Sequence, residues 1–229
     1  MTLIVPNLRS IWVDFISSKR SKAEKSVLIP TDHVLRHLNF HILPPFIIVT
    51  MSSKIEDIIL LYGGDLSSDV ADQISTKLAT LPIVDDGTAT HIHKIAMSKS
   101  KDFKTALLEG PLAKPTSLAI FITQTIENEA PPEDAGACIR FFKRKTHPET
   151  LLTNHSLFAV IGLGDSNLLL DRQHTAAKDC NQVAQMLDAR LEKLGGQRFC
   201  ERGEGDERTG LQEVDPWIDM LVEKIKECL

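Results

Sequence analysis

The stretch Leu157-Phe-Ala-Val-Ile-Gly-Leu-Gly-Asp-Ser-Asn167 decides the fold of this chain. Its apolar beginning, Leu157–Ile161, is unbroken, which is typical of a strand buried on both faces of a parallel sheet. The glycines that follow allow a tight turn and a close approach of the backbone to a flat ligand. A dinucleotide-binding turn is not indicated, because the third glycine of that pattern is absent and no helix begins at once.

Apolar runs and helical patterns alternate on both sides of this stretch, from about residue 56 onward. Further strands are predicted at Asp57–Tyr62, His91–Met97 (an outer strand), Ser117–Ile122 and near Arg198–Cys200. Helices are predicted over Ser67–Leu78, Pro131–Phe142 and Ala176–Leu194, and from Asp215 onward.

This alternation predicts an α/β fold with one doubly wound parallel sheet. Ser67 or Ser68 is expected to cap the first helix and Asp215 the last, since both residue types accept hydrogen bonds from free helical amides. Ligands bind such sheets where the strands end. Function is therefore sought in the loops after Tyr62, Thr123 and Ile161.

Composition narrows the function classes. The 229 residues carry a net charge of -5, which gives no electrostatic reason to expect nucleic acid or an anionic membrane as a partner. No apolar run approaches the roughly 20 residues that span a bilayer. The four cysteines are scattered without a C-x-x-C pair, which indicates free thiols in a reducing compartment such as the cytoplasm.

The first fifty residues differ from the rest, with a basic run near Lys19–Lys25 and no clear period. Asp14 and Glu24 argue against a transit peptide. We expect residues 1–50 to be an N-terminal extension that is disordered or not native, and residues 51–229 to be the folded domain.

Four segments together resemble the FMN domain of the diflavin reductase family: Phe158–Ser166, Leu187–Gly196, Arg202-Gly-Glu-Gly-Asp206 and Val214-Asp-Pro-Trp217. The resemblance implies a flavodoxin-like, three-layer fold with five parallel strands in the order 2-1-3-4-5. It also implies FMN as the cofactor, bound at the three loops, and electron transfer as the activity. We expect the domain to lack the FAD/NADPH module, so that a redox partner or a reductase supplied in trans would provide the electrons.

The same resemblance places the FMN contacts in three loops and one further position. They are Gly63, Ser67 and Ser68 in the first loop, Thr125, Ile126 and Asn128 in the second, Gly162, Leu163, Gly164, Asp165 and Leu168 in the third, and Asp206.

The loops also depart from the family pattern. The first is shorter and places Asp65 and Asp69 beside the expected phosphate. Glu127 and Glu129 replace two glycines of the second loop, which strains the backbone wherever the family glycine has a positive φ. Ile126 and Leu168 stand where the family has aromatic rings that cover the flavin, and an insertion, Leu168–Thr175, delays the next helix.

Two functions therefore remain open: an FMN-binding electron carrier, and a degenerate domain that no longer binds FMN and serves as a protein-interaction module. Asp206 and Glu204 either line the ligand edge or belong to a solvated acidic loop. A metal site at His91 and His93 lacks a third ligand, and Ser166 lacks the Gly-x-Ser-x-Gly turn of a hydrolase.

Overall fold

The computed structural model describes residues 54–81, 90–169 and 177–228. The predicted extension over residues 1–50, and most of the predicted insertion after Leu168, lie outside these ranges. The domain described below begins at residue 54.

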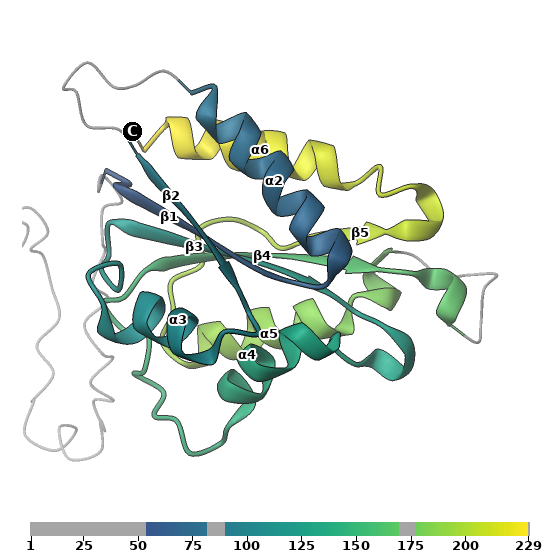
Figure 1. The fold of residues 1–229 in the computed structure, drawn as a ribbon, viewed down its shortest axis with the longest axis horizontal. Coiled ribbons are helices and arrows are strands. Elements are labelled where there is room, and N and C mark those ends of the chain that lie inside the picture. The colour runs from purple at the N-terminus through teal and green to yellow at the C-terminus, as the bar shows by residue number, and fades with distance from the viewer. Residues whose placement is uncertain (1–53, 82–89, 170–176, 229) are drawn as a thin grey trace, which may run out of the picture. The chain divides into compact units, whose positions relative to one another are not determined.

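Five parallel strands form one sheet in the order β2-β1-β3-β4-β5, which confirms the predicted topology (Figure 1). The order places β1 and β3 side by side in register, with Ile59 opposite Ala119. The strands are β1 (Asp57–Gly63), β2 (His91–Ala96), β3 (Ser117–Gln124), β4 (Leu157–Gly164) and β5 (Gly203–Asp206).

Helices cover both faces of the sheet, α2 and α6 on one and α3, α4 and α5 on the other (Figure 1). The helices are α2 (Asp65–Ala79), α3 (Ser100–Lys104), α4 (Glu133–Lys143), α5 (Gln182–Lys193) and α6 (Val214–Lys226). A π-helical turn, Thr105–Glu109, continues α3, and single 3-10 turns follow or precede several elements: Glu127–Glu129, Ser166–Leu168, Ala177–Cys180 and Glu207–Thr209.

The central strands form two hydrophobic clusters because their side chains point alternately to opposite faces. Ile58 and Leu60 of β1 join the cluster beneath α2 and α6, whereas Ile59 and Leu61 join the cluster above α3, α4 and α5. Trp217 is buried in the first cluster, as its helical spacing predicts. Burial on both faces explains why these strands are continuous apolar runs.

The fifth strand is not where the sequence predicts it. Residues Arg198–Cys200 make only one isolated bridge, between Arg198 and Phe158, and β5 begins at Gly203. A Cβ atom on Gly203 would lie 2.8 Å from the Trp217 ring of α6. Because glycine has no Cβ, α6 can pack closely against the chain at this position. Close packing of α6, rather than β-propensity, therefore decides the position of this edge strand.

Several helix ends also differ from the predictions. Helix α6 begins at Val214, and the carboxylate of Asp215 accepts a hydrogen bond from Gln73 of α2 (2.6 Å) instead of capping its own helix. Helix α5 begins at Gln182, after a 3-10 turn, rather than near residue 176. Helix α3 was not predicted, because five residues are too few to show a helical period.

Candidate functional site

The loops after β1, β3 and β4 gather at the carboxyl ends of the strands, at the right of Figure 1. The chain leaves β1 toward β2 on one side and later enters β3 on the other, so the strand order reverses between β1 and β3. Sheets of this kind bind ligands in the crevice at that reversal.

The first loop turns directly into α2 through Gly64, whose φ of 111° only glycine adopts readily. Helix α2 therefore begins at Asp65 with no side-chain cap, and the capping role predicted for Ser67 or Ser68 is wrong. Ser67 is buried inside the first turn, where its hydroxyl donates to the carbonyl of Gly63 (3.0 Å). Ser68 is half-buried in the same turn.

Within the described residues, three backbone amides at the start of α2 lack an internal acceptor, and Asp65, the first of them, is exposed. The amides of Asp65, Leu66 and Ser67 have no acceptor among residues 54–81, 90–169 and 177–228, as is usual for the first turn of an uncapped helix. The amide of Gly64 donates to the Asp134 carboxylate (3.2 Å), a contact that the sequence did not reveal. The helix N-terminus thus already attracts one negative group from the start of α4.

The second loop closes on itself. The amide of Ile126 donates to the carbonyl of Ala130 (2.8 Å) across the 3-10 turn Glu127–Glu129. Glu129 has a φ of 57°, so the predicted backbone strain is present there, whereas Glu127 lies outside the left-handed region and is not strained. The side chain of Asn128 lies outside what the structure describes.

Thr125 fixes the second loop to the third. Its amide donates to the carbonyl of Leu163 (2.9 Å), and its hydroxyl accepts from the amide of Val183 (3.2 Å). Thr125 is buried, and Leu163 is buried beside it in β4. The hydroxyl therefore satisfies one of the free amides at the start of α5.

The glycines of the third loop make room for the segment that precedes α5. A Cβ atom on Gly164 would lie 2.1 Å from the carbonyl oxygen of Cys180, and one on Gly162 would lie 2.5 Å from Oδ1 of Asn181. Gly63, in the first loop, has the same function toward Ala135 of α4, at 2.5 Å. These three predicted contact residues are buried, and their free side is packed by the chain itself.

Asp206 holds the third loop from the end of β5. Its carboxylate accepts from the amide of Ser166 (3.0 Å), the hydroxyl of Ser166 (2.6 Å) and the amide of Arg208 (3.1 Å). Burial raises the pKa of this carboxyl, but these hydrogen bonds outweigh burial and hold the pKa below its ordinary value. Asp206 is only 1% exposed, so it is not part of a solvated acidic loop. Asp165, by contrast, is half-buried and caps the following turn through the amide of Asn167 (2.8 Å).

The two positions that the family pattern assigns to aromatic rings carry exposed aliphatic side chains. Ile126 is 43% exposed and Leu168 is 47% exposed. Across the parts of the chain that the structure describes, Met220 is the only other large apolar side chain with comparable exposure. Exposed apolar side chains on two loops of one sheet end are suited to covering a flat apolar ligand or a partner surface.

A groove of about 670 Å³ opens between the first loop, the second loop and α4. Gly64 and Asp65 line it from the start of α2, Gln124 and Ile126 from the end of β3, and Arg140 from α4. This volume is ordinary for a small-molecule site. The groove thus joins Asp65, at the free start of α2, to one of the two exposed aliphatic side chains.

Sequence reasoning missed Asn181, which has two internal contacts here. Its amide nitrogen donates to the carbonyls of Gly205 (2.8 Å) and Ala177 (2.7 Å), and its Oδ1 is buried without a hydrogen-bond partner. An asparagine directly before a helical period is a recognisable boundary signal. Its contacts to the β5 edge become visible only in the fold.

The metal alternative finds no support in residues 54–81, 90–169 and 177–228, which contain no group of three potential ligands. The ring nitrogen Nε2 of His93 lies 3.0 Å from the Asp57 carboxylate. The same ranges contain no helix long and apolar enough to cross a membrane. The four cysteines are free, as their spacing predicts.

Residues 86–217 match the flavodoxin family, so the chain, more than half of which is matched, belongs to that family. Methionine synthase reductase from Bos taurus is 32% identical over 153 residues, which cover 66% of this chain and 19% of that protein. NADPH-dependent diflavin oxidoreductase 1 from Bos taurus is 36% identical over 111 residues, which cover 47% of this chain and 17% of that protein. The chain is thus a flavodoxin-like domain of the diflavin reductase family, and it spans about a fifth of the length of these relatives.

A solved structure agrees on the fold. A point mutant of flavodoxin from Pseudomonas aeruginosa superimposes with a TM-score of 0.51 at 16% identity, covering 74% of this chain and 99% of that one. The family match begins at residue 86 and so leaves out β1 and the loop after it. The first of the three loops, which is shorter than the family pattern, therefore lies outside the match.

Proposed function

We propose that this domain binds FMN at the carboxyl end of the sheet and serves as an electron carrier. The observation that carries the proposal is the groove of about 670 Å³ that begins at the unpaired amides of α2 and extends to the exposed side chain of Ile126. Helix N-termini with free amides hold phosphate groups, and apolar side chains cover a flat ring. The residues present therefore fit the two ends of a flavin nucleotide.

Each part of the site has a defined task in this proposal. The amides of Asp65 and Leu66 hold the phosphate, while Ile126 and Leu168 cover the ring. Bound FMN supplies the redox chemistry, because it accepts and donates one or two electrons. Asp206 and Thr125 act at a distance from the ligand: their hydrogen bonds to Ser166 and Val183 keep the third and second loops in place.

The acidic side chains of the loops oppose binding without blocking it. Glu127, Glu129 and Asp65 are all exposed, so their carboxylates can remain in water while the backbone contacts the ligand. Exposed charges a few ångströms apart in water interact by only about 1 kcal/mol. We expect these residues to weaken FMN binding, not to abolish it.

Electrons must come from another redox protein in this proposal. The relatives are named as a methionine synthase reductase and an NADPH-dependent diflavin oxidoreductase. A reductase of the kind that those names describe would supply this domain in trans. The free cysteines fit a reducing compartment, and we propose the cytoplasm.

A second candidate function rests on one contact. The Asp134 carboxylate accepts the amide of Gly64 at the end of β1, where a phosphate would otherwise be the natural negative group. If that contact persists in solution, the loops form a self-contained surface. The domain would then be a protein-interaction module without flavin.

An absorbance titration of the purified full chain with FMN distinguishes the two candidates. Flavin bands that co-purify, or a saturable titration, are expected for the electron carrier. A colourless protein that leaves high concentrations of FMN unperturbed would establish the interaction module instead.

Two matched variants locate the site. Ile126→Asp places a charge where the proposed ring would cover it and should weaken FMN binding by about tenfold or more, since a charge that loses its water without gaining a partner is costly. Met220→Asp introduces the same group at a similarly exposed position on α6 and should leave binding unchanged. Equal losses in both variants would exclude Ile126 from the site.

A further inference from the structure

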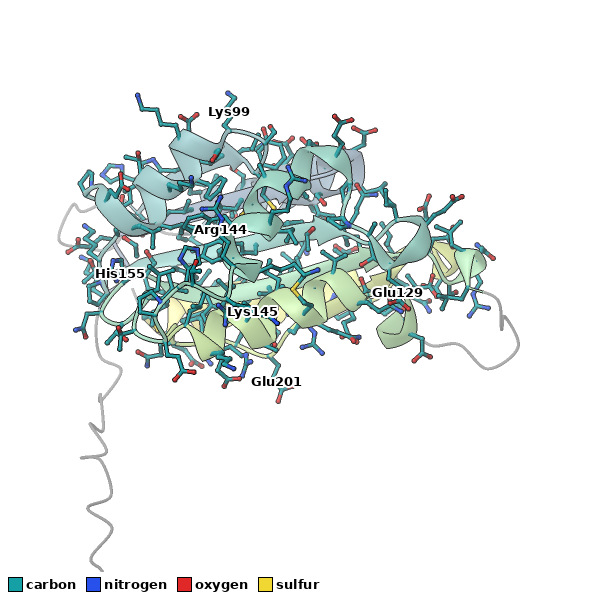
Figure 2. The ribbon with its side chains drawn as sticks, turned by 90° about the horizontal axis from the view of Figure 1, so that it is seen from below. Lys99, Glu129, Arg144, Lys145, His155 and Glu201 are labelled. Carbon is teal, nitrogen blue, oxygen red and sulfur yellow. The ribbon has the colours of Figure 1, made fainter. Side chains whose placement is uncertain are left out.

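A second groove lies at the far end of α4 and α5, away from the flavin loops. It encloses about 640 Å³ between the last turn of α4, the loop that follows it and the last turns of α5. The loop contributes Lys145, His147 and Glu149, α4 contributes Lys143, and α5 contributes Met186 and Lys193. Figure 2 shows Arg144 and Lys145 on this face of the helical layer, well away from Glu129 of the second flavin loop.

The walls of this groove carry more positive than negative side chains, since Glu149 is the one carboxylate among the described residues that line it. The exposed ammonium groups of Lys143, Lys145 and Lys193 have no carboxylate within ion-pair distance in the described part of the chain. Elsewhere in the described ranges, Lys77 and Lys114 have such partners, whereas Lys99 and Lys101 lack them as well, so the groove differs by gathering its lysines around one hollow. A chain with a net charge of -5 that leaves lysines unpaired in one groove has a local attraction for negative charge.

Helix ends alone do not account for this arrangement. Lysine is favoured in the last turn of a helix, which explains Lys143 in α4 and Lys193 in α5. Lys145 lies two residues beyond the end of α4, outside the last turn in which lysine is favoured. The guanidinium of Arg190 donates to the carbonyls of Phe142 (2.9 Å) and Arg144 (2.6 Å), so the loop that carries Lys145 is fixed against α5.

The floor of the groove is apolar. Met186 is half-buried and Ala189 is exposed, both on α5. Methionine adapts its shape to different apolar partners. No phenylalanine, tyrosine or tryptophan side chain is exposed in the described ranges, so the groove lacks the stacking surface that single-stranded nucleic acid requires.

We propose that this groove binds an acidic segment of a partner protein. Carboxylates of the segment pair with Lys143, Lys145 and Lys193, and an apolar side chain of the segment packs on Met186 and Ala189. The site lies at the end of the sheet opposite the flavin loops, so its occupation leaves those loops accessible. A flavin site and a docking site at opposite ends would let this domain stay attached to one partner while its loops meet another.

The test uses fluorescence anisotropy of a labelled synthetic peptide in which acidic residues alternate with leucine, titrated with the full chain. Binding is expected at low salt, with weakening as salt rises because exposed ion pairs are screened. The same peptide with serine in place of leucine should bind at least several-fold more weakly, since it cannot use the apolar floor. Equal binding of the two peptides would overturn the proposal.

Charge-reversal variants locate the peptide. Lys143→Glu with Lys145→Glu should weaken binding by about tenfold or more, because two attractions become repulsions. Ala189→Glu should weaken it as well, and glutamate is a good helix former at this exposed position in α5. The control, Lys99→Glu with Lys101→Glu, makes the same change of charge at the start of α3 and should have little effect.

Three outcomes would overturn the proposal. Equal weakening in the α3 control would show attraction to overall charge rather than to the groove. Tighter binding of a single-stranded oligonucleotide of the same charge would identify a nucleic-acid surface. Absence of saturable peptide binding, with circular dichroism confirming folded variants, would show that the groove binds no acidic segment. None of these readouts depends on FMN.

Discussion

Glu129 is strained in a way that its neighbour Glu127 is not. Its φ of 57° lies in the left-handed region, which costs a residue with a side chain about 1–2 kcal/mol. Glu129→Gly should therefore raise the free energy of unfolding by about 0.5 kcal/mol, after the greater flexibility of glycine in the unfolded chain is deducted. Glu127→Gly removes the same charge from the same turn and should lower the free energy of unfolding by about 0.5 kcal/mol. Urea unfolding measures both, and a decrease in both variants would contradict the assigned strain.

The same pair of variants addresses flavin affinity. Both substitutions remove a carboxylate from the second loop, so both should strengthen FMN binding if charge is the obstacle. Unchanged affinity in the double variant would place the obstacle in the first loop, where Asp134 contacts Gly64.

Asp206 makes stability depend on pH. Its folded pKa lies below the ordinary value of 3.8, so its contribution is complete above that pH and is lost as the pH falls through the folded pKa. Asp206→Asn should cost about 2 kcal/mol at neutral pH, because charge-assisted hydrogen bonds to Ser166 and Arg208 are weakened. The difference in the free energy of unfolding between this variant and the unmodified chain should become smaller below about pH 4.

Thermal unfolding across this pH range measures the effect. Asp165→Asn is the matched control, because that half-buried carboxylate accepts a hydrogen bond from the amide of nearby Asn167. This substitution should lower the free energy of unfolding by less than about 1 kcal/mol. A difference for Asp206→Asn that stays constant down to acidic pH would show that its hydrogen bonds do not depend on its charge.

Residue types alone could not separate ligand contacts from internal ones. Glycines and a threonine at strand ends predict a ligand site, yet Gly164 faces Cys180 and the Thr125 hydroxyl faces Val183. These roles depend on how the loops pack against the start of α5, and this tertiary packing cannot be read from the sequence. The family pattern assigns Ile126 and Leu168 to the ligand face; both side chains are exposed, and their contact with FMN stays a prediction.

Among the elements, α5 is fixed through one buried carboxylate. Asp188 is 4% exposed and accepts from Arg198 (2.9 Å) and Arg202 (2.9 Å), the two arginines that flank the segment leading into β5. Asp188→Ala should lower the free energy of unfolding by about 2–3 kcal/mol, because both half-buried guanidinium groups lose the buried carboxylate that they share and keep only Glu192 and Glu204. Glu192→Ala removes the exposed carboxylate that also binds Arg198 and should cost less than about 1 kcal/mol. Urea unfolding of both variants checks the prediction, and equal losses would contradict it.

Elements were predictable where hydrophobicity specifies them directly. The runs that became β1, β3 and β4 are buried on both faces, so they carry an unbroken apolar signal. The sequence of β5, Gly203-Glu-Gly-Asp206, carries no such signal, because contact with α6 and β4 positions it. Helix starts differ from the predictions for a related reason. The turn at Gly64 lets α2 begin at Asp65, before the predicted start, and the Asp215 carboxylate binds Gln73 of α2 instead of capping α6.

At the scale of the whole molecule, the sheet separates two hydrophobic clusters that share no side chain. One lies under α2 and α6 and the other against α3, α4 and α5. The topology was predictable from the sequence because alternating strands and helices allow few right-handed arrangements. Whether the two clusters unfold together is a separate question, since each could open while the other persists.

Buried cysteines provide a probe in each cluster. Cys138 of α4 belongs to the cluster with α3 and α5, and Cys200 belongs to the cluster with α2 and α6. Burial raises the pKa of Cys200 to about 11 and that of Cys138 higher still, so neither thiol forms the reactive thiolate while its cluster is closed. Half-buried Cys228 should react with iodoacetamide first and serve as the internal reference.

Short pulses of iodoacetamide across a urea series, read by mass spectrometry, should then modify Cys138 and Cys200 with one shared midpoint. A shared midpoint is expected because β1, β3 and β4 each contribute side chains to both clusters, so a strand cannot leave one cluster without disrupting the other. Modification of Cys200 at lower urea than Cys138 would show instead that the layer of α2 and α6 opens on its own. That layer carries the start of α2, so such opening would also release the amides proposed to hold the FMN phosphate.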